Sequence, residues 1–85
     1  MKQITIDCSA IDSPLALHAA LRDALSFPEW YGNNLDALHD CLTAITEETE
    51  LTLEHFLGLD DFAGRFLRVL ANAAQENPKL DITIL

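Results

Sequence analysis

Alternation of apolar and polar residues marks three short segments of this chain. Residues 2–7 read K-Q-I-T-I-D, residues 48–55 read E-T-E-L-T-L-E-H, and the chain ends in D-I-T-I-L at residues 81–85. Successive side chains of a strand point to opposite faces of a sheet, so this alternation is typical of half-buried β-strands. We therefore expect strands at the start, in the middle and at the end of the chain.

Apolar residues at helical spacing predict two helices between the first and second strands. Ser13 and Pro14 suit the N-cap and first position of a helix, which should end near Ser26 because the residue before Pro28 disfavours helical backbone. Its core side would carry Leu17, Leu21, Ala24 and Leu25. The second helix runs from about Leu35 to Ile45, with an apolar stripe of Leu35, Leu38, Leu42 and Ile45.

A third helix is predicted between the second and third strands. After a short helical turn around residues 55–59, Asp60 or Asp61 would cap a longer helix that Asn77-Pro78 ends. Its core side would carry Phe62, Phe66, Val69, Leu70 and Ala73. The element order is then strand-helix-helix-strand-helix-strand, and strands separated by helices favour a parallel sheet with right-handed crossovers.

The length and composition suit one small globular domain over residues 1–85. The chain has 85 residues, of which 49% are hydrophobic, and only two cysteines. Such a chain can bury one core, and it lacks the cysteine density of a disulfide scaffold. We expect an α/β domain with a small three-stranded parallel sheet packed with helices, and Cys8 and Cys41 as small buried thiols.

The second predicted helix carries a polar stripe that its core side does not need. Asp36, His39, Asp40 and Thr43 follow one another at helical spacing. Two like charges one turn apart disfavour a helix by a few tenths of a kcal/mol. The helix dipole explains Asp36 in the first turn but explains Asp40 less well. The stripe is either a solvated surface or a surface that meets cationic groups of a partner.

The loop before this helix reads E-W-Y-G-N-N at residues 29–34. Gly32 can take positive φ, and Asn33 or Asn34 can cap the helix. At least one of the rings of Trp30 and Tyr31 should be partly exposed. Exposed Trp and Tyr are typical interface anchors, and with neighbouring acids they suit Arg or Lys of a partner.

Charge is distributed unevenly along the chain. The net charge is -9, and no Lys or Arg occurs from Ser26 to Gly64, a stretch that holds nine of the 14 acidic residues. This distribution repels nucleic acid and anionic membranes, and it attracts basic proteins. Solubility alone is the alternative explanation. No segment approaches the roughly 20 apolar residues that cross a bilayer, and the N-terminus does not read as a signal peptide.

Most catalytic chemistries lack support in the sequence. There is no GxSxG, GxGxxG, P-loop, HExxH or Ca²⁺-loop motif, so we expect no cofactor and no metal. His18 and His55 are interpreted as structural residues, with His18 on a helix flank. An enzyme that uses Asp36, His39 and Asp40 is the remaining catalytic alternative, and metal-dependent turnover lost on chelation would support it. Cytoplasmic localisation is the default, because two cysteines without a CxxC fit a reducing compartment.

The segment F-P-E-W-Y-G-N-N-L-D-A-L-H-D-C-L-T resembles the barstar family, whose corresponding stretch reads L-P-E-Y-Y-G-E-N-L-D-A-L-W-D-C-L-T. "SPLALHAALRDAL", "LTLEHF" and "DITIL" resemble further segments of that family. The resemblance implies a barstar-like fold and an intracellular inhibitor of a secreted bacterial ribonuclease, whose acids take the place of RNA phosphates in a basic active site. The partner-binding positions it implies are Trp30, Tyr31, Asn34, Leu35, Asp36, Ala37, His39, Asp40, Thr43 and Glu76.

Several positions depart from the family pattern. His39 stands where the family has a tryptophan, and Trp30 stands where it has a tyrosine. The contact that the family makes from its last helix aligns with Asn72, with Glu76 as a nearby acid. These departures bear on which target is bound, so a binding or immunity protein for a different basic partner or toxin is the alternative.

Overall fold

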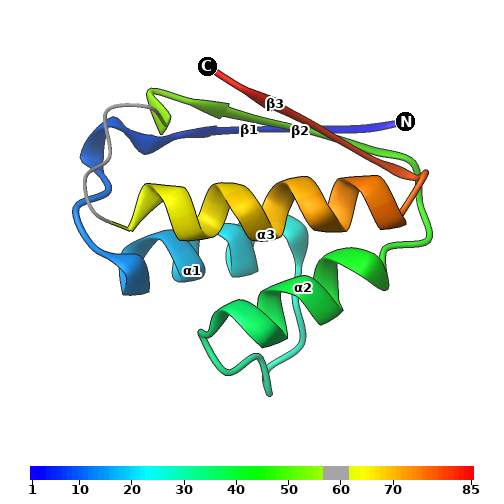
Figure 1. The fold of residues 1–85 in the computed structure, drawn as a ribbon, viewed down its shortest axis with the longest axis horizontal. Helices are drawn as coiled ribbons and strands as arrows, with labels where there is room; N and C mark the ends of the chain where they lie inside the picture. Colours follow the sequence, from blue (N-terminus) through cyan, green and yellow to red (C-terminus); the bar gives the residue numbers. More distant parts are fainter. Residues whose placement is uncertain (57–61) are drawn as a thin grey trace.

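The computed structural model describes residues 1–56 and 62–85 of the chain (Figure 1). Its elements in chain order are β1 (Lys2–Asp7), the short 3-10 helix η1 (Cys8–Ala10), α1 (Pro14–Leu25), α2 (Leu35–Thr43), β2 (Thr49–Glu54), α3 (Ala63–Glu76) and β3 (Leu80–Ile84). The strand-helix-helix-strand-helix-strand order is therefore confirmed. The expected turn around residues 55–59 lies largely outside the described residues, as do Asp60 and Asp61.

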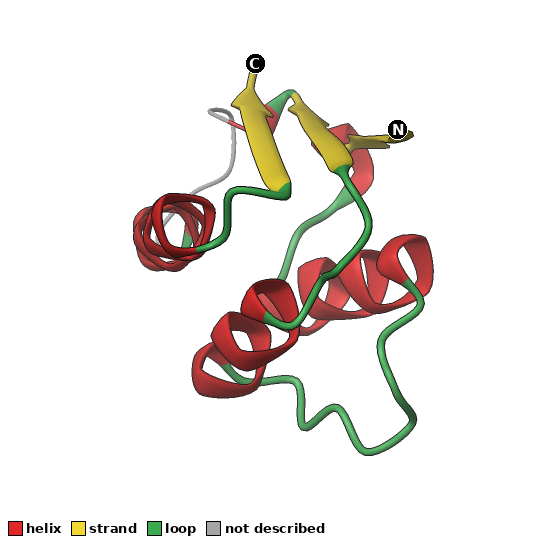
Figure 2. Ribbon diagram, turned by 90° about the vertical axis from the view of Figure 1, so that its right-hand side faces the viewer, coloured by secondary structure: helices red, strands yellow, loops and turns green. Residues whose placement is uncertain are grey.

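The three strands form one parallel sheet in the order β1-β2-β3. Their register aligns apolar residues in rows across the sheet: Ile4 with Leu51 and Ile82, and Ile6 with Leu53 and Ile84. All three α-helices lie on one side of the sheet (Figure 2). The molecule is thus a two-layer α/β structure in which one face of the sheet bears exposed or half-buried polar residues such as Thr5 and Thr83.

The core lies between the sheet and the helices. The fully buried side chains include Leu17 and Leu21 of α1, Leu38 and Leu42 of α2, Leu51 and Leu53 of β2, and Phe66 and Leu70 of α3. These are the apolar positions that the strand and helix periodicities predict. Cys8 and Cys41 are both free and buried, as expected, and burial raises the pKa of each thiol.

Side-chain caps fix where α1 and α2 begin. The Ser13 hydroxyl accepts a hydrogen bond from the Ala16 N–H at 3.1 Å, and Oδ1 of Asn34 accepts one from the Ala37 N–H at 2.8 Å. Both caps occupy predicted positions. For α3 the N-cap residue is Phe62, which makes no side-chain cap hydrogen bond, so the predicted acidic cap is not seen at that position.

Helix α2 ends at Thr43 and not at Ile45 as predicted. The cause is Asn77, whose buried Nδ2 donates to the carbonyl oxygens of Leu42 and Ile45 at 3.0 Å each. These bonds satisfy backbone acceptors at the helix end, so the chain can leave the helix without unpaired buried carbonyls. Ile45 still packs against the core from its position just beyond the helix.

Gly32 does not use the positive φ that glycine allows. Positive φ occurs instead at Asn33, with φ 53, and at Ser26, with φ 58, which ends α1. A Cβ at Gly32 would lie 2.9 Å from Nδ2 of Asn34, so the Asn34 side chain would have to shift. Glycine at this position therefore leaves room for the asparagine that caps α2.

Candidate partner-binding surface

Helix α2 presents two carboxylates on its outer side. Asp36 lies exposed in the first turn, and Asp40 follows one turn later with 78% of its side chain accessible. Side chains four residues apart share one side of a helix, so both anions face the same way. Leu38, Cys41 and Leu42 meanwhile face the core. The two acids of the predicted polar stripe are therefore exposed on the surface of the molecule.

His39 joins this surface to α3. Its Nε2 lies 2.5 Å from Oε2 of Glu76, 37 positions later in the chain. A carboxylate can only accept, so Glu76 holds a proton on Nε2 of the imidazole. Nδ1 of His39 lies 3.9 Å from Oδ1 of Asp40, which is beyond direct hydrogen-bond distance. His39 thus sits between two carboxylates, with Glu76 from the last helix beside the acids of α2.

The two aromatic residues of the preceding loop take opposite positions. Trp30 is 72% exposed, whereas Tyr31 is buried. The expectation that at least one ring would be exposed is confirmed by Trp30. The hydroxyl of Tyr31 lies 2.5 Å from Nδ1 of His18 in α1, and its ring packs near that of Phe27. Tyr31 thus anchors the loop to the core, whereas Trp30 points toward solvent.

His18 is buried in the core and does not lie on a helix flank. Its ring contacts those of Tyr31 and Phe66, with centroid separations of 5.7 and 4.7 Å. Burial lowers the pKa of His18, and burial raises the pKa of Tyr31 to about 12. Both groups are therefore uncharged at neutral pH. His18 lies at helical spacing from Leu21 and Leu25, and that spacing could have indicated its burial.

The remaining predicted positions are partly structural. Asn34 caps α2, Leu35 and Ala37 are half-buried against the core, and the hydroxyl of Thr43 donates to the His39 carbonyl at 2.9 Å. The structure thus brings Asp36, His39, Asp40 and Glu76 to one side of α2 and α3. Tyr31 is the predicted position with the least access to a partner.

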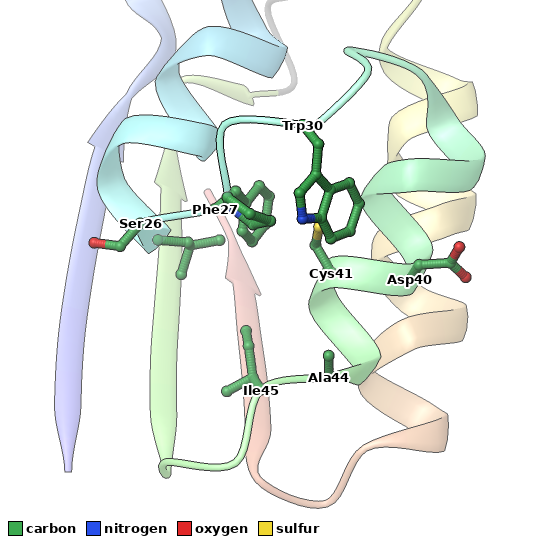
Figure 3. A pocket seen from close by; sticks show the side chains of 9 residues that line it. Ser26, Phe27, Trp30, Asp40, Cys41, Ala44 and Ile45 are labelled. Atoms are coloured by element: carbon green, nitrogen blue, oxygen red, sulfur yellow. The ribbon is translucent and has the colours of Figure 1, made fainter.

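A hollow lies between the loop and α2, with a volume of about 240 Å³ (Figure 3). Trp30 forms one wall, and Asp40 is at its edge. Figure 3 shows the carboxylate of Asp40 directed away from the hollow. The exposed Trp30 and Asp40 of α2 therefore border the same hollow. We refer to Trp30, Asp36, His39, Asp40 and Glu76 together as the candidate surface.

The candidate surface offers anions and an aromatic face. Within residues 1–56 and 62–85, no three His, Cys, Asp or Glu side chains are placed to hold a metal ion. The same ranges contain no helix of sufficient length and apolar character to cross a bilayer. The exposed indole of Trp30 and the exposed carboxylates of α2 are each suited to contact with cationic groups of another molecule.

The chain is similar to known proteins. Residues 1–84 match the family described as "Barstar (barnase inhibitor)". The chain is also 38% identical to a protein of Bacillus subtilis (strain 168) in an alignment over 81 residues, and the match covers 89% of each chain. That protein is named "Putative ribonuclease inhibitor YrdF".

Proposed function

The chain belongs to the barstar family, and we propose that it inhibits a ribonuclease of the barnase type by binding and blocking the basic active site of that enzyme. The observation that carries this proposal is the pair of exposed carboxylates on α2, one turn apart, in a stretch without any Lys or Arg. A ribonuclease must bind phosphates, so its active site offers cationic groups that can pair with carboxylates.

In the proposed complex, Asp36 and Asp40 occupy places that RNA phosphates would take. The two like charges cost a few tenths of a kcal/mol in the free helix. Cationic groups of the enzyme would neutralise them, and the field of the acidic surface would speed the encounter. Glu76 adds a third carboxylate beside them through His39. Trp30 provides an exposed aromatic contact.

Inhibition of this kind is stoichiometric and involves no turnover by the inhibitor. The role assigned to the acids is electrostatic contact, which requires neither a nucleophile nor a general base in the chain. A cell that makes a secreted ribonuclease needs such an inhibitor in its cytoplasm for self-protection, and we place the protein there.

The test is a titration of RNA cleavage by a small secreted bacterial ribonuclease of the barnase class. We expect activity to fall to zero at one equivalent of inhibitor. Asp40→Ala should weaken inhibition by at least about 100-fold, because it removes an exposed anion from the centre of the interface. Glu48→Ala is the matched control, since it removes an exposed acid beyond the end of α2, and it should change inhibition less than about 3-fold. Equal losses from the two substitutions would contradict the proposed use of Asp40.

A different basic partner is the second candidate, and His39 is the observation that favours it. The family has a tryptophan at this position, and here an imidazole held by Glu76 takes its place. The shape and hydrogen bonding of the contact therefore differ from the family pattern. If the ribonuclease keeps full activity, affinity capture with the wild type against an Asp36→Ala/Asp40→Ala double variant should identify a partner that only the wild type retains.

A further inference from the structure

Strand β3 forms an outer edge of the sheet, on a part of the molecule that the proposed function does not use. Within the described ranges its backbone pairs with β2 on one side only. The Leu85 N–H donates to the Leu53 carbonyl of β2 at 2.9 Å. Alternate residues of a strand bond to the same neighbour, so every second residue of β3, counted from Leu85, bonds to β2. The backbone N–H and C=O groups of Ile82 and Ile84 are therefore directed to the open edge.

This edge lacks most of the features that keep sheet edges from pairing. Its register with β2 is continuous from Leu80 to Ile84, without a bulge or a proline, and Asp81 is its single charged residue. Ile82 and Ile84 point toward the helix layer but are only half-buried, whereas the apolar residues of the central strand β2 are buried. An open and largely uncharged edge of this kind pairs readily with another strand.

Helix α3, which packs on β3, presents an uncharged side next to this edge. Glu76 contacts α2, and Leu67 lies nine positions earlier, about two and a half helical turns, so the two residues face opposite ways. Ala74 is on the same side of α3 as Leu67, and it lines a surface depression together with Leu80 of β3. Figure 2 likewise shows α3 directly beneath β3. This side of α3 holds one exposed leucine and otherwise small residues: Ala63, Gly64, Leu67, Ala71 and Ala74.

From these observations we propose that two copies of the protein join through β3, antiparallel and around a two-fold axis, so that their three-stranded sheets become one. Ile82 of each copy pairs with Ile84 of the other, and each such pair exchanges two backbone hydrogen bonds. The helix layers lie on the same side of the joined sheet, so the two α3 helices lie side by side. Leu67 of each copy packs against the small residues of the opposite α3.

A second copy is the occupant that this edge selects. The edge requires a strand with free hydrogen-bonding groups, apolar side chains on the helix side and little charge, and β3 itself meets all three requirements. The other edge strand, β1, carries Lys2 and Asp7 at its ends, and a join between β1 and β3 would continue as a filament without closing. The two-fold join also keeps Asp36 and Asp40 of the two copies apart, because α2 lies on the opposite side of α3 from Leu67.

The charge of Asp81 sets the register. An axis through Asp81 or Ile82 would bring the two Asp81 carboxylates opposite or diagonal to each other, and like charges so placed destabilise a sheet. An axis through Leu80 would bring Pro78, which has no N–H, into the new ladder. An axis through Thr83 separates the acids. The Thr83 residues of the two copies then face each other in a pair that shares no backbone hydrogen bond.

Sedimentation velocity of the intact protein from about 10 μM to about 1 mM tests the proposal, because this range covers the weak dissociation constants of small interfaces. We expect a monomer at the low end and a dimer at the high end. Thr83→Lys puts two like charges on the axis and should weaken dimerisation by at least about 5-fold. Thr5→Lys is the matched control, since Thr5 is the exposed residue at the same level of the opposite edge strand. It should change the dissociation constant by less than about 2-fold.

A cysteine at the axis gives an independent readout. Facing residues that share no backbone hydrogen bond lie about 4.5 Å apart at Cα, which is within the range of a disulfide. Under mild oxidation Thr83→Cys should form a covalent dimer and Thr5→Cys should stay monomeric. Cys8 and Cys41 do not compete, because both are buried. A wild type that is monomeric over the whole concentration range, equal cross-linking of the two cysteine variants, or species that grow beyond the dimer would each overturn the proposal.

The β3 edge and the candidate surface are separate, so the ribonuclease titration distinguishes this proposal from the proposed function. Thr83→Lys should inhibit at the same one-to-one ratio as the wild type, and Asp40→Ala should dimerise as the wild type does. If the ribonuclease is not inhibited, the proposed function fails, and sedimentation still decides the role of β3. If inhibition is complete but no dimer forms, the β3 proposal fails alone.

Discussion

The hydroxyl of Tyr31 lies 2.5 Å from Nδ1 of His18, and both side chains are buried. One residue comes from the loop that carries Trp30, and the other from the middle of α1. The pair therefore fixes the loop to the helix layer through one hydrogen bond and through the aromatic contacts of Tyr31 with Phe27 and of His18 with Phe66. A loop held in this way has little conformational freedom left to lose if a partner binds it.

The buried pair predicts that the protein loses stability in mild acid. Burial lowers the pKa of His18 in the folded state, so the unfolded chain takes up the proton first as the pH falls. The free energy of unfolding should decrease as the pH drops below about 6.5, the ordinary pKa of histidine. Urea unfolding at several pH values between about 7.5 and 5.5 measures this decrease.

Replacement of His18 and, separately, of His55 assigns the acid effect. His18→Asn should flatten the pH dependence over this interval, because the titrating group is gone. His55→Asn removes an exposed histidine, whose Nδ1 lies 2.9 Å from Oδ1 of Asp7, and should leave most of the dependence in place. A wild-type profile that stays level down to pH 5.5 would contradict the role given to His18.

Because of Tyr31, we expect a second loss of stability at alkaline pH. Its pKa is about 12 in the folded protein, against about 10 in an unfolded chain. The contribution of Tyr31 to the free energy of unfolding is complete below about pH 10. It is lost as the pH rises toward 12, because the Tyr31 hydroxyl loses its proton first in the unfolded chain. Tyr31 is the only tyrosine, so ultraviolet absorbance of the phenolate follows it directly. Half-ionisation near pH 10 with the fold intact would show that Tyr31 is accessible to water.

Asn77 predicts a stability effect away from the candidate surface. Its amide nitrogen donates to two carbonyls at the end of α2, and its Oδ1 accepts from the Lys79 N–H at 3.0 Å. Asn77→Ala leaves these groups unpaired and should lower the free energy of unfolding by about 1–3 kcal/mol. Asn72→Ala, at an exposed position of α3, should change it by less than about 0.5 kcal/mol. Denaturant unfolding compares the two variants.

The contact between His39 and Glu76 predicts coupled effects on binding. In the free protein this pair is partly exposed, with 36% and 59% of the side chains accessible, so its loss should cost less than about 1 kcal/mol of stability. In the ribonuclease titration, His39→Ala, Glu76→Gln and the double variant form a cycle. We expect a coupling energy of about 0.5 kcal/mol or more, because each residue holds the other in place. Strictly additive losses would show that the two act independently.

Salt should slow association with a basic ribonuclease. Asp36 and Asp40 of the candidate surface lie in a stretch without Lys or Arg, and screening at about 0.15 M salt limits their attraction for a basic partner to roughly 8 Å. Stopped-flow fluorescence of Trp30 should show an association rate that falls about 10-fold or more between low and high salt. The Asp36→Ala/Asp40→Ala variant should show a weaker dependence, and an association rate insensitive to salt would argue against steering by this surface.

Much of the fold follows from local pattern. The three strands, the helix starts at Ser13 and Asn34, and the burial of the apolar stripes all follow from periodicity and capping, which act within a few residues. The end of α2 could not be predicted from local pattern. Its last carbonyl oxygens accept hydrogen bonds from Asn77, which lies 32 to 35 positions away in the chain. Local pattern does not encode such a contact.

The same distinction between local sequence pattern and distant contacts applies to the candidate surface. The exposure of Asp36 and Asp40 follows from their place opposite the core stripe of α2. The sequence did not predict which of Trp30 and Tyr31 faces outward. That depends on the hydrogen bond between Tyr31 in the loop and His18 in α1. The contact of His39 with Glu76 likewise needs α2 and α3 to be packed side by side. Which partner the surface binds stays a prediction.

The helix layer lies wholly on one side of the sheet, and both chain ends belong to the outer strands of that sheet (Figure 1). Helix α2 is at the opposite side of the molecule from these ends. A fluorescent protein, an affinity handle or a surface tether joined to either end would therefore leave the acidic helix unobstructed. The fold is therefore suited to immobilisation through either end, with α2 facing the solution.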